Sequence, residues 1–411
     1  MLARINALPR MAVLALALPI ALLLAWRVLV AGIGALSERS LETGGQAVGA
    51  SADAVAAEAS MRQRLARNPA DATAILLLAI ELERQGRRDE AGAAMRTAVR
   101  LAPADPQSLL LVAGYFLRAG EEAQALTALR RAADSSQAMV GDRVWPVFST
   151  ALATGRHRKF FDDLARDNPL WWPVFFRHAC AKGPSAGAVQ AVFAARVAAD
   201  VATLDERRCL IERLQRDGQW TGAYLVWLNG LPLEQRQRVG YVFNGGFELP
   251  LSNAGFDWRI PVQDGVVVAA EPGDGTAGAL ALNVTFVNQR YSGPPVYQHL
   301  LLAPGRYRLE GRVRSDLNAW LGLQWGLYCL EGAGRDTRQL AHSEPFAGST
   351  RWREFGEGFA VPANCPAQTL RLELANPKQG ANAPGAVAIR LKGKVWFDDV
   401  RVRIVDYHGA G

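Results

Sequence analysis

Cysteine and histidine are scarce in this chain, and the signature motifs of most enzyme classes are missing. Among 411 residues there are 4 cysteines and 5 histidines, and the histidines are scattered without the short spacings of metal ligands. A zinc or haem site is therefore not expected. No nucleophile elbow, phosphate-binding loop, dinucleotide-binding glycine pattern or H-E-x-x-H motif occurs in a convincing context. We expect a protein that is not an enzyme and carries no organic cofactor.

One enzyme class stays open as the lesser alternative, because a glycoside hydrolase needs little more than two carboxylates at a suitable separation. The candidate acids are Glu354 with Glu357, or Asp398 with Asp399. Neighbouring acidic residues also occur on many protein surfaces without a catalytic role. A hydrolase would require these carboxylates to converge in a cleft.

Long runs of one charge sign are also absent. The formal net charge is +7, but the arginines are interspersed with acidic residues along most of the chain. This pattern is typical of a mixed, solvated surface, and we expect no nucleic acid as a partner. Anionic glycans or anionic lipid headgroups are the partners that the excess of positive charge would favour.

A long apolar run covers residues 11–36, with Arg27 as its single interior charge. About 20 apolar helical residues cross a bilayer core, so this run predicts a membrane anchor. Arg4 and Arg10 precede it, which places the N-terminus in the cytoplasm. We expect a single-pass protein of the bacterial inner membrane with its bulk in the periplasm. A cleavable signal peptide is the alternative, and it gives the same compartment for the bulk.

Composition divides the rest of the chain into a helical and a β-rich region. The predicted parts are a cytoplasmic tail (1–10), the anchor (11–36), a small polar linker that turns helical toward its end (37–60), a helical region (61–238) and a β-rich region (239–411). The four cysteines fall two and two in the last two regions. An oxidising compartment allows both pairs to be bridged, namely Cys180 with Cys209 and Cys329 with Cys365.

A repeat with a constant offset of 34 residues runs through residues 69–136. Aspartate and proline open each unit, glycine recurs at Gly86 and Gly120, and small alanines recur at Ala91 and Ala125. Each unit predicts a helical hairpin whose glycine ends the first helix and whose alanines allow close packing. The period and residue types resemble the tetratricopeptide repeat.

The helical pattern continues more weakly to residue 238, and we expect an all-α solenoid over residues 61–238. Trp171, Trp172, Phe175 and Phe176 are assigned to its core. Solenoids of this kind bind partners in a groove, so the resemblance implies protein partners for this region.

Short β-branched and aromatic runs separated by turn residues fill the region from residue 239 onward, and they predict an all-β sandwich. Its motifs resemble, in order, those of the jelly-roll carbohydrate-binding modules: residues 242–248, Trp258, 302–307, Trp352 and 395–400. The resemblance implies a jelly-roll fold and places Trp258, Trp352 and Trp396 at packing positions.

The resemblance also implies a structural calcium ion near the first and last strands. The matching groups would be Glu248 and Asp398 or Asp399, with the backbone carbonyl of Asn244 or Gly245 completing the shell. The alternative is a surface glutamate and an ordinary turn at the end of a strand.

A sugar-binding surface needs aromatic faces and planar polar groups, and the best candidate lies in residues 320–329. Strand parity places Trp320, Gln324 and Tyr328 on one face, with glycines between them. The alternative is a strand covered on both sides, whose glycines mark bulges. Secondary candidates for glycan contact are Tyr291, Tyr297 and Arg312.

Together these patterns predict a non-catalytic periplasmic scaffold. Its helical repeats would recruit protein partners, and its sandwich would bind a polysaccharide during assembly or export of an exopolysaccharide or envelope glycan. The alternative is a sandwich that serves only as a structural cap or protein-docking module.

Overall fold

The computed structural model describes residues 52–101, 105–273, 275–291, 293–319, 321–331, 335–375 and 390–405. The predicted membrane anchor at residues 11–36 lies outside them. Among the residues that are described, no helix is both long and apolar enough to cross a bilayer. The chain folds as two compact units that divide between Ala202 and Thr203.

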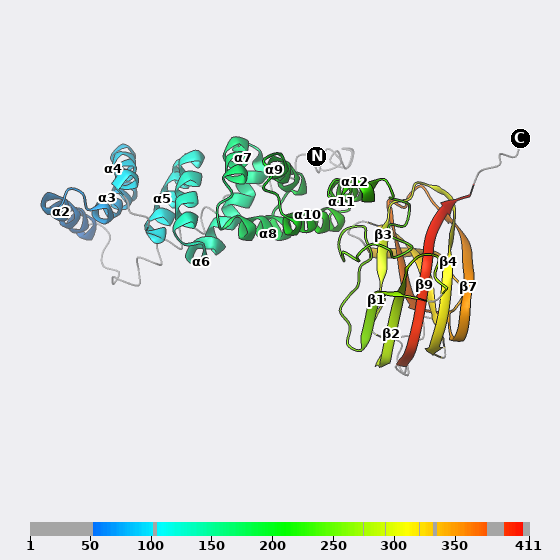
Figure 1. Ribbon diagram of the computed structural model, residues 1–411. Coiled ribbons are helices and arrows are strands. Elements are labelled where there is room, and N and C mark those ends of the chain that lie inside the picture. The colour runs from blue at the N-terminus through cyan, green and yellow to red at the C-terminus, as the bar shows by residue number, and fades with distance from the viewer. Residues whose placement is uncertain are drawn as a thin grey trace, which may run out of the picture. The chain divides into compact units, whose positions relative to one another are not determined.

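The first unit is built from helices alone in its described part (Figure 1). Its elements are α2 (Ala52–Arg67), α3 (Ala72–Arg84), α4 (Arg88–Leu101), α5 (Pro106–Ala119), α6 (Glu122–Thr154), α7 (Arg158–Asp167), α8 (Trp172–Lys182) and α9 (Ala186–Ala198). Helix α2 begins inside the segment that we predicted as a linker. Helix α6 contains two helices joined at Ser136, whose φ of −164° and ψ of 91° are not helical.

The helix ends reproduce the 34-residue offset of the sequence. Asp71 caps α3 by accepting from the backbone N–H of Ala74, and Asp105 caps α5 in the same way through Ser108. Gly86 and Gly120 both have a φ of +79°, the left-handed conformation that ends a helix at little cost only for glycine. The sequence prediction of two equivalent helical hairpins is therefore confirmed.

The apolar positions that match at this offset are buried in both hairpins. The equivalent pairs are Ile75 and Leu109, Leu78 and Val112, Leu82 and Phe116, Met95 and Leu129, and Ala98 and Ala132. Further along the unit, Trp171, Trp172, Phe175 and Phe176 are each at most 3% exposed, as predicted for core residues.

The second unit begins with α10 (Leu204–Arg216), α11 (Trp220–Leu228) and α12 (Leu233–Arg236). The sequence pattern grouped these helices with the repeats. In the structure Trp227 of α11 contacts the rings of Phe243 and Phe256, with centroid distances of 5.0 and 5.7 Å. Aromatic packing thus attaches α11 to the segment that leads into the β-rich region.

Nine strands of the described residues form two antiparallel sheets. They are β1 (Val266–Pro272), β2 (Leu280–Arg290), β3 (Tyr297–Leu300), β4 (Gly305–Asn318), β5 (Leu323–Glu331), β6 (Arg335–His342), β7 (Gly348–Val361), β8 (Ala367–Leu374) and β9 (Arg390–Ile404). The five-stranded sheet has the order β1-β2-β9-β4-β7, visible side by side in Figure 1, and the four-stranded sheet has the order β3-β8-β5-β6.

The two sheets share one apolar core, so the predicted β-sandwich is confirmed. Strand β4 shows how alternation along the sequence produces this core. Its Tyr307, Leu309 and Val313 are buried, whereas the alternate arginines face outward. Trp258, Trp325 and Phe397 lie at the centre and are fully buried, with ring centroids 5.0 to 5.6 Å apart. Trp258 therefore occupies the core position expected for it.

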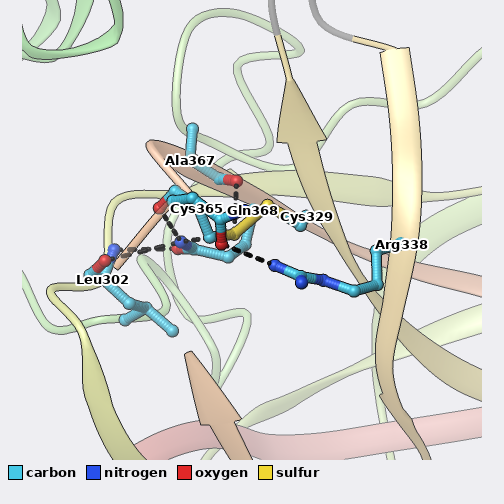
Figure 2. Close-up of a disulfide and its surroundings, with 7 residues drawn as sticks. Leu302, Cys329, Arg338, Cys365, Ala367 and Gln368 are labelled. Atoms are coloured by element: carbon cyan, nitrogen blue, oxygen red, sulfur yellow. Dashed lines mark hydrogen bonds between the residues drawn. A yellow bond between two sulfur atoms is a disulfide. The ribbon is translucent and has the colours of Figure 1, made fainter. Parts of the chain in front are cut away.

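Figure 2 shows the disulfide between Cys329 on β5 and Cys365, which precedes β8. Gln368 holds the same turn, because its side chain accepts from the N–H of Leu302 and donates to the carbonyl of Cys365. This predicted pair is confirmed. Cys180 is buried on α8 in the first unit and Cys209 lies on α10 in the second, so a bridge between them would join the units and stays a prediction.

Candidate functional site

The predicted sugar-binding face is largely covered. Trp320 lies outside the described residues, while Gln324 and Tyr328 are only 3% and 9% exposed. The strand parity was predicted correctly, since Leu323 and Trp325 face the core between the sheets. The alternative of a strand covered on both sides therefore describes Gln324 and Tyr328.

A cluster of polar side chains accounts for the burial of Tyr328. The hydroxyl of Tyr328 donates to Glu373 at 2.6 Å, and the guanidinium of Arg371 stacks 3.8 Å from the centroid of the Tyr328 ring. Arg371 also donates to the second carboxylate oxygen of Glu373 at 2.7 Å. Burial, and then the hydrogen bond to Glu373, raise the pKa of Tyr328 to about 12. The phenol is thus a neutral donor committed to this cluster.

The secondary glycan candidates are distributed over both sheets. Tyr291 lies near the Tyr328 cluster, where burial and the charge of Glu373 raise its pKa. Tyr297 is half-buried on β3, with its ring 5.3 Å from that of His299. Arg312 lies on β4 of the other sheet, so the structure does not bring it together with the tyrosines.

Two of the tryptophans assigned to packing positions are in fact on the outer face of the five-stranded sheet. Trp396 lies between Val395 and Phe397, which are fully buried, so parity turns it away from the core. It is half-exposed and stacks with Arg314, while Trp352 is half-exposed and stacks with Arg312. The core assignment was wrong because the motif does not reveal which member of an alternating run faces inward.

The oxygens proposed as calcium ligands already accept hydrogen bonds from the chain. Asp398 accepts from the N–H groups of Ala277 and Asp399, and Glu248 accepts from that of Leu280. The carbonyl of Asn244 accepts from the indole N–H of Trp258 at 3.0 Å.

The ion pairs around these oxygens also weigh against a bound calcium ion. Asp399 pairs with Arg401, and the guanidinium of Arg312 lies 3.9 Å from Asp398. In the described part of the chain, no three acidic, histidine or cysteine side chains gather as a metal site. Calcium needs several converging oxygens, so the hydrogen bonds and ion pairs at these oxygens weigh against the calcium site, which stays a prediction.

A pocket of 360 Å³ lies within the second unit between α11, the segment that follows α12, and β3. Its wall is mainly aromatic, and the principal lining residues are Tyr224, Trp227, Tyr241, Phe243, Phe256 and His299. Tyr241 is 43% exposed, which leaves one aromatic face at the mouth. The amide of Gln298 fixes the opposite wall by bonding both the N–H and the carbonyl of Phe243.

His299 and Tyr224 of this pocket are uncharged at neutral pH. Burial, with a smaller contribution from Arg259, lowers the pKa of His299 to about 4. Its Nδ1 lies 3.2 Å from the hydroxyl of Thr369. Burial raises the pKa of Tyr224. The pocket therefore offers aromatic faces, phenol hydroxyls and a neutral imidazole to a ligand.

Sequence reasoning missed this pocket. Tyr224 and Trp227 stand three residues apart on α11 and so share a helix face, but that spacing is the usual signal of a helix packed into a core. Tyr241 and Phe243 lie in the strand-like run just after the predicted boundary at residue 239. Nothing in the sequence shows that these two segments meet.

Comparisons with known proteins give matches among solved structures. No protein-family model and no curated relative matches the chain. One similar structure is a family 4 carbohydrate-binding module, with 15% identity and a TM-score of 0.29, covering 40% of this chain and 99% of that one. The CBM22-1 xylan-binding domain of Paenibacillus barcinonensis Xyn10C has 15% identity and a TM-score of 0.26, covering 36% of this chain and 86% of the domain.

A third match is the enzymatically active domain of tailspike protein 4 from bacteriophage CBA120. It has 12% identity and a TM-score of 0.29, and the alignment covers 41% of this chain and 22% of the tailspike chain. Similarity at these levels supports no inference about the ligand of the present chain.

Proposed function

We propose that this protein is a non-catalytic binding protein whose second unit takes a neutral saccharide into the aromatic pocket. The observation that carries the proposal is the lining of the pocket, which combines five aromatic side chains with the neutral imidazole of His299. Pyranose rings present apolar C–H faces that pack on aromatic rings, together with hydroxyls that pair with a few fixed polar groups.

The size of the pocket suits a short part of a glycan. Ligand pockets range from about 300 to 1,000 Å³, and 360 Å³ is near the lower end. The protein would therefore hold a chain end or a short segment, with Tyr241 at the mouth as the side chain most accessible to a sugar ring.

The first unit would serve as the scaffold for protein partners, as its resemblance to tetratricopeptide repeats implies. Support comes from a groove of 450 Å³ between α4, α5 and α6, lined in part by Arg96, Arg100 and Arg131. Three arginines beside the apolar side chains of Val99 and Phe116 would favour an acidic segment with apolar anchors.

The proposed setting is the envelope of a bacterium. The apolar run at residues 11–36 would anchor the chain in the inner membrane, and the two units would act in the periplasm during assembly or export of an exopolysaccharide or envelope glycan.

A purely structural or protein-docking sandwich is the second candidate. The burial of Gln324 and Tyr328 favours it, because their face of the four-stranded sheet is used for internal contacts. A hydrolase is the weakest candidate. Glu354, Glu357 and Asp399 line one pocket of 410 Å³, but Asp399 pairs with Arg401, and Asp398 accepts two backbone hydrogen bonds.

Affinity electrophoresis of the full chain through a panel of neutral polysaccharides tests the proposal. We expect at least one polymer to retard the wild type, and Tyr241→Ala to abolish the retardation. Leu225→Ala is the matched control, because Leu225 is 50% exposed on α11 and does not line the pocket. Equal retardation of Tyr241→Ala and wild type would place glycan binding outside the pocket, and retardation of neither by any polymer would favour the structural sandwich.

A further inference from the structure

The outer face of the five-stranded sheet carries a second surface, which we call the Trp–Arg face. It is formed by alternate residues of β4 and β9, which face away from the core, and by Trp352 of the neighbouring strand β7. Its members are Arg312, Arg314, Trp352, Lys392, Lys394 and Trp396. Register pairing sets Arg314 opposite Trp396, so these side chains belong to adjacent strands.

Two guanidinium groups on this face lie over tryptophan rings. The Cζ atom of Arg314 lies 4.8 Å from the centroid of Trp396, and that of Arg312 lies 5.3 Å from the centroid of Trp352. A stacked guanidinium keeps its N–H donors in its own plane, where they can pair with a carboxylate in a bidentate manner. The stacks thus fix the orientation of an anion-binding group before any ligand arrives.

Three of the cations on this face have no ion-pair partner among the described residues. Arg314, Lys392 and Lys394 are exposed, and none of them has an ion-pair partner within the described ranges. Asp316 faces Lys394 across the ladder without forming an ion pair there. Arg312 differs, because it lies 3.9 Å from the buried carboxylate of Asp398.

A hydrogen-bond donor beside the stack is also unused. Asn283 on β2 pairs with Trp396 across the ladder and is 2% exposed. Its Oδ1 accepts from Thr285, but its Nδ2 has no acceptor among the described residues. Buried polar groups are normally paired, so this unpaired amide shows that the sheet beside Trp396 is not fully satisfied by the described part of the chain.

We propose that the Trp–Arg face binds an acidic polysaccharide whose carboxylates pair with Arg314, Lys392 and Lys394. Lys392 and Lys394 are alternate residues of β9, about 6.8 Å apart, and Arg314 lies beside the next outward position, Trp396, so the three cations are spaced along the strand direction as a repeating polyanion requires. The tryptophan edges provide apolar contact for the sugar rings between the carboxylates. This inference goes beyond the neutral pocket and does not depend on it.

Affinity electrophoresis of the full chain in polygalacturonate, with neutral galactan as the comparison, tests the inference. At about 50 mM salt we expect polygalacturonate to retard the wild type and galactan to retard it less. Arg314→Gln should weaken the apparent affinity for polygalacturonate about tenfold, as expected for the loss of a charge-assisted hydrogen bond. Lys394→Gln should weaken it by a smaller factor.

Arg306→Gln is the matched control. Arg306 is exposed on the same strand and at the same parity as Arg314, but it has no tryptophan stack. The variant removes the same charge and should bind almost as the wild type does. Tyr241→Ala should also retain polygalacturonate binding, which separates this face from the pocket. Both arginines are exposed, and matching thermal melts will show that the variants are folded.

Three results would overturn the inference. The first is an absence of retardation of the wild type by polygalacturonate. The second is an equal loss of affinity in Arg314→Gln and Arg306→Gln, which would indicate attraction by net charge alone. The third is binding to anionic lipid vesicles that depends on Arg314 without any binding to the polymer, which would make the face a membrane contact.

Discussion

Removal of the disulfide between Cys329 and Cys365 should destabilise the second unit by an amount that the loop length sets. The two cysteines are separated by 36 residues. In the loop-entropy model, opening a loop of this size lowers the free energy of unfolding by about 4 kcal/mol at 25 °C. Gln368 would still bond Leu302 and Cys365 after the change, so the native turn should persist and the loss should come from the freer unfolded chain.

This loss corresponds to a large thermal shift. For a unit of about 200 residues, each kcal/mol lowers the melting temperature by about 2–4 °C, so the double variant Cys329→Ala/Cys365→Ala should melt about 8–16 °C lower. Differential scanning calorimetry without reductant measures this shift for the second unit. The double variant Cys180→Ala/Cys209→Ala controls for the other cysteines, and added reductant should bring the wild type to the melting temperature of the first variant or below.

A small shift would refute this reasoning. If the Cys329→Ala/Cys365→Ala variant melts within about 2 °C of the wild type, the loop is already constrained in the unfolded chain or the cysteines are not bridged. Thiol titration of the denatured wild type without reductant distinguishes these two causes.

Three further predictions concern single features of the fold. Tyr328→Phe leaves the buried carboxylate of Glu373 with one donor fewer and should lower the unfolding free energy by about 1–3 kcal/mol in denaturant titrations, whereas an unchanged midpoint would contradict the hydrogen bond. Gly120→Ala forces a side chain into a φ of +79° and should cost about 1 kcal/mol or more, so equal stability would argue against the left-handed helix end. Excess calcium should not raise the melting temperature of the second unit above that in chelator, and a clear rise would restore the calcium site.

The pH dependence of stability provides another test, through His299. Its folded pKa of about 4 lies below the ordinary value near 6.5, so between these limits the unfolded chain binds more protons than the folded one. Stability should therefore fall as the pH is lowered from about 6.5 to about 4, and His299→Gln should flatten this part of the profile. Denaturant midpoints across the range measure the effect, and parallel profiles would exclude a buried neutral His299.

The helix ends and the alternation along strands could be predicted from the sequence, because each depends on a few residues that are neighbours in the chain. The 34-residue offset predicted the caps at Asp71 and Asp105 and the glycine turns, since a helix end is determined by a few neighbouring residues. Alternation along β4 predicted its buried face for the same reason.

Features that depend on tertiary contacts were missed or misplaced. The parity of residues 320–329 was correct, yet it could not show that Arg371 and Glu373 from β8 would cover Tyr328. The same limit applies to the pocket, which is made from α11 and from β3, segments about 70 residues apart in the chain. Periodicity reveals that a side chain shares a face with its neighbours, and only the fold decides what that face meets.

The attachment of α11 to the β-rich region has a consequence for how this architecture could be inherited. Trp227 closes over Phe243 and Phe256, and Trp220 lies against His299 on β3. A recombination that transferred only the strands to another gene would expose these aromatic residues and leave an apolar patch on the surface of the sandwich. The segment that can be transferred as a folded unit therefore starts near Thr203. It includes α10, α11 and α12 together with the strands.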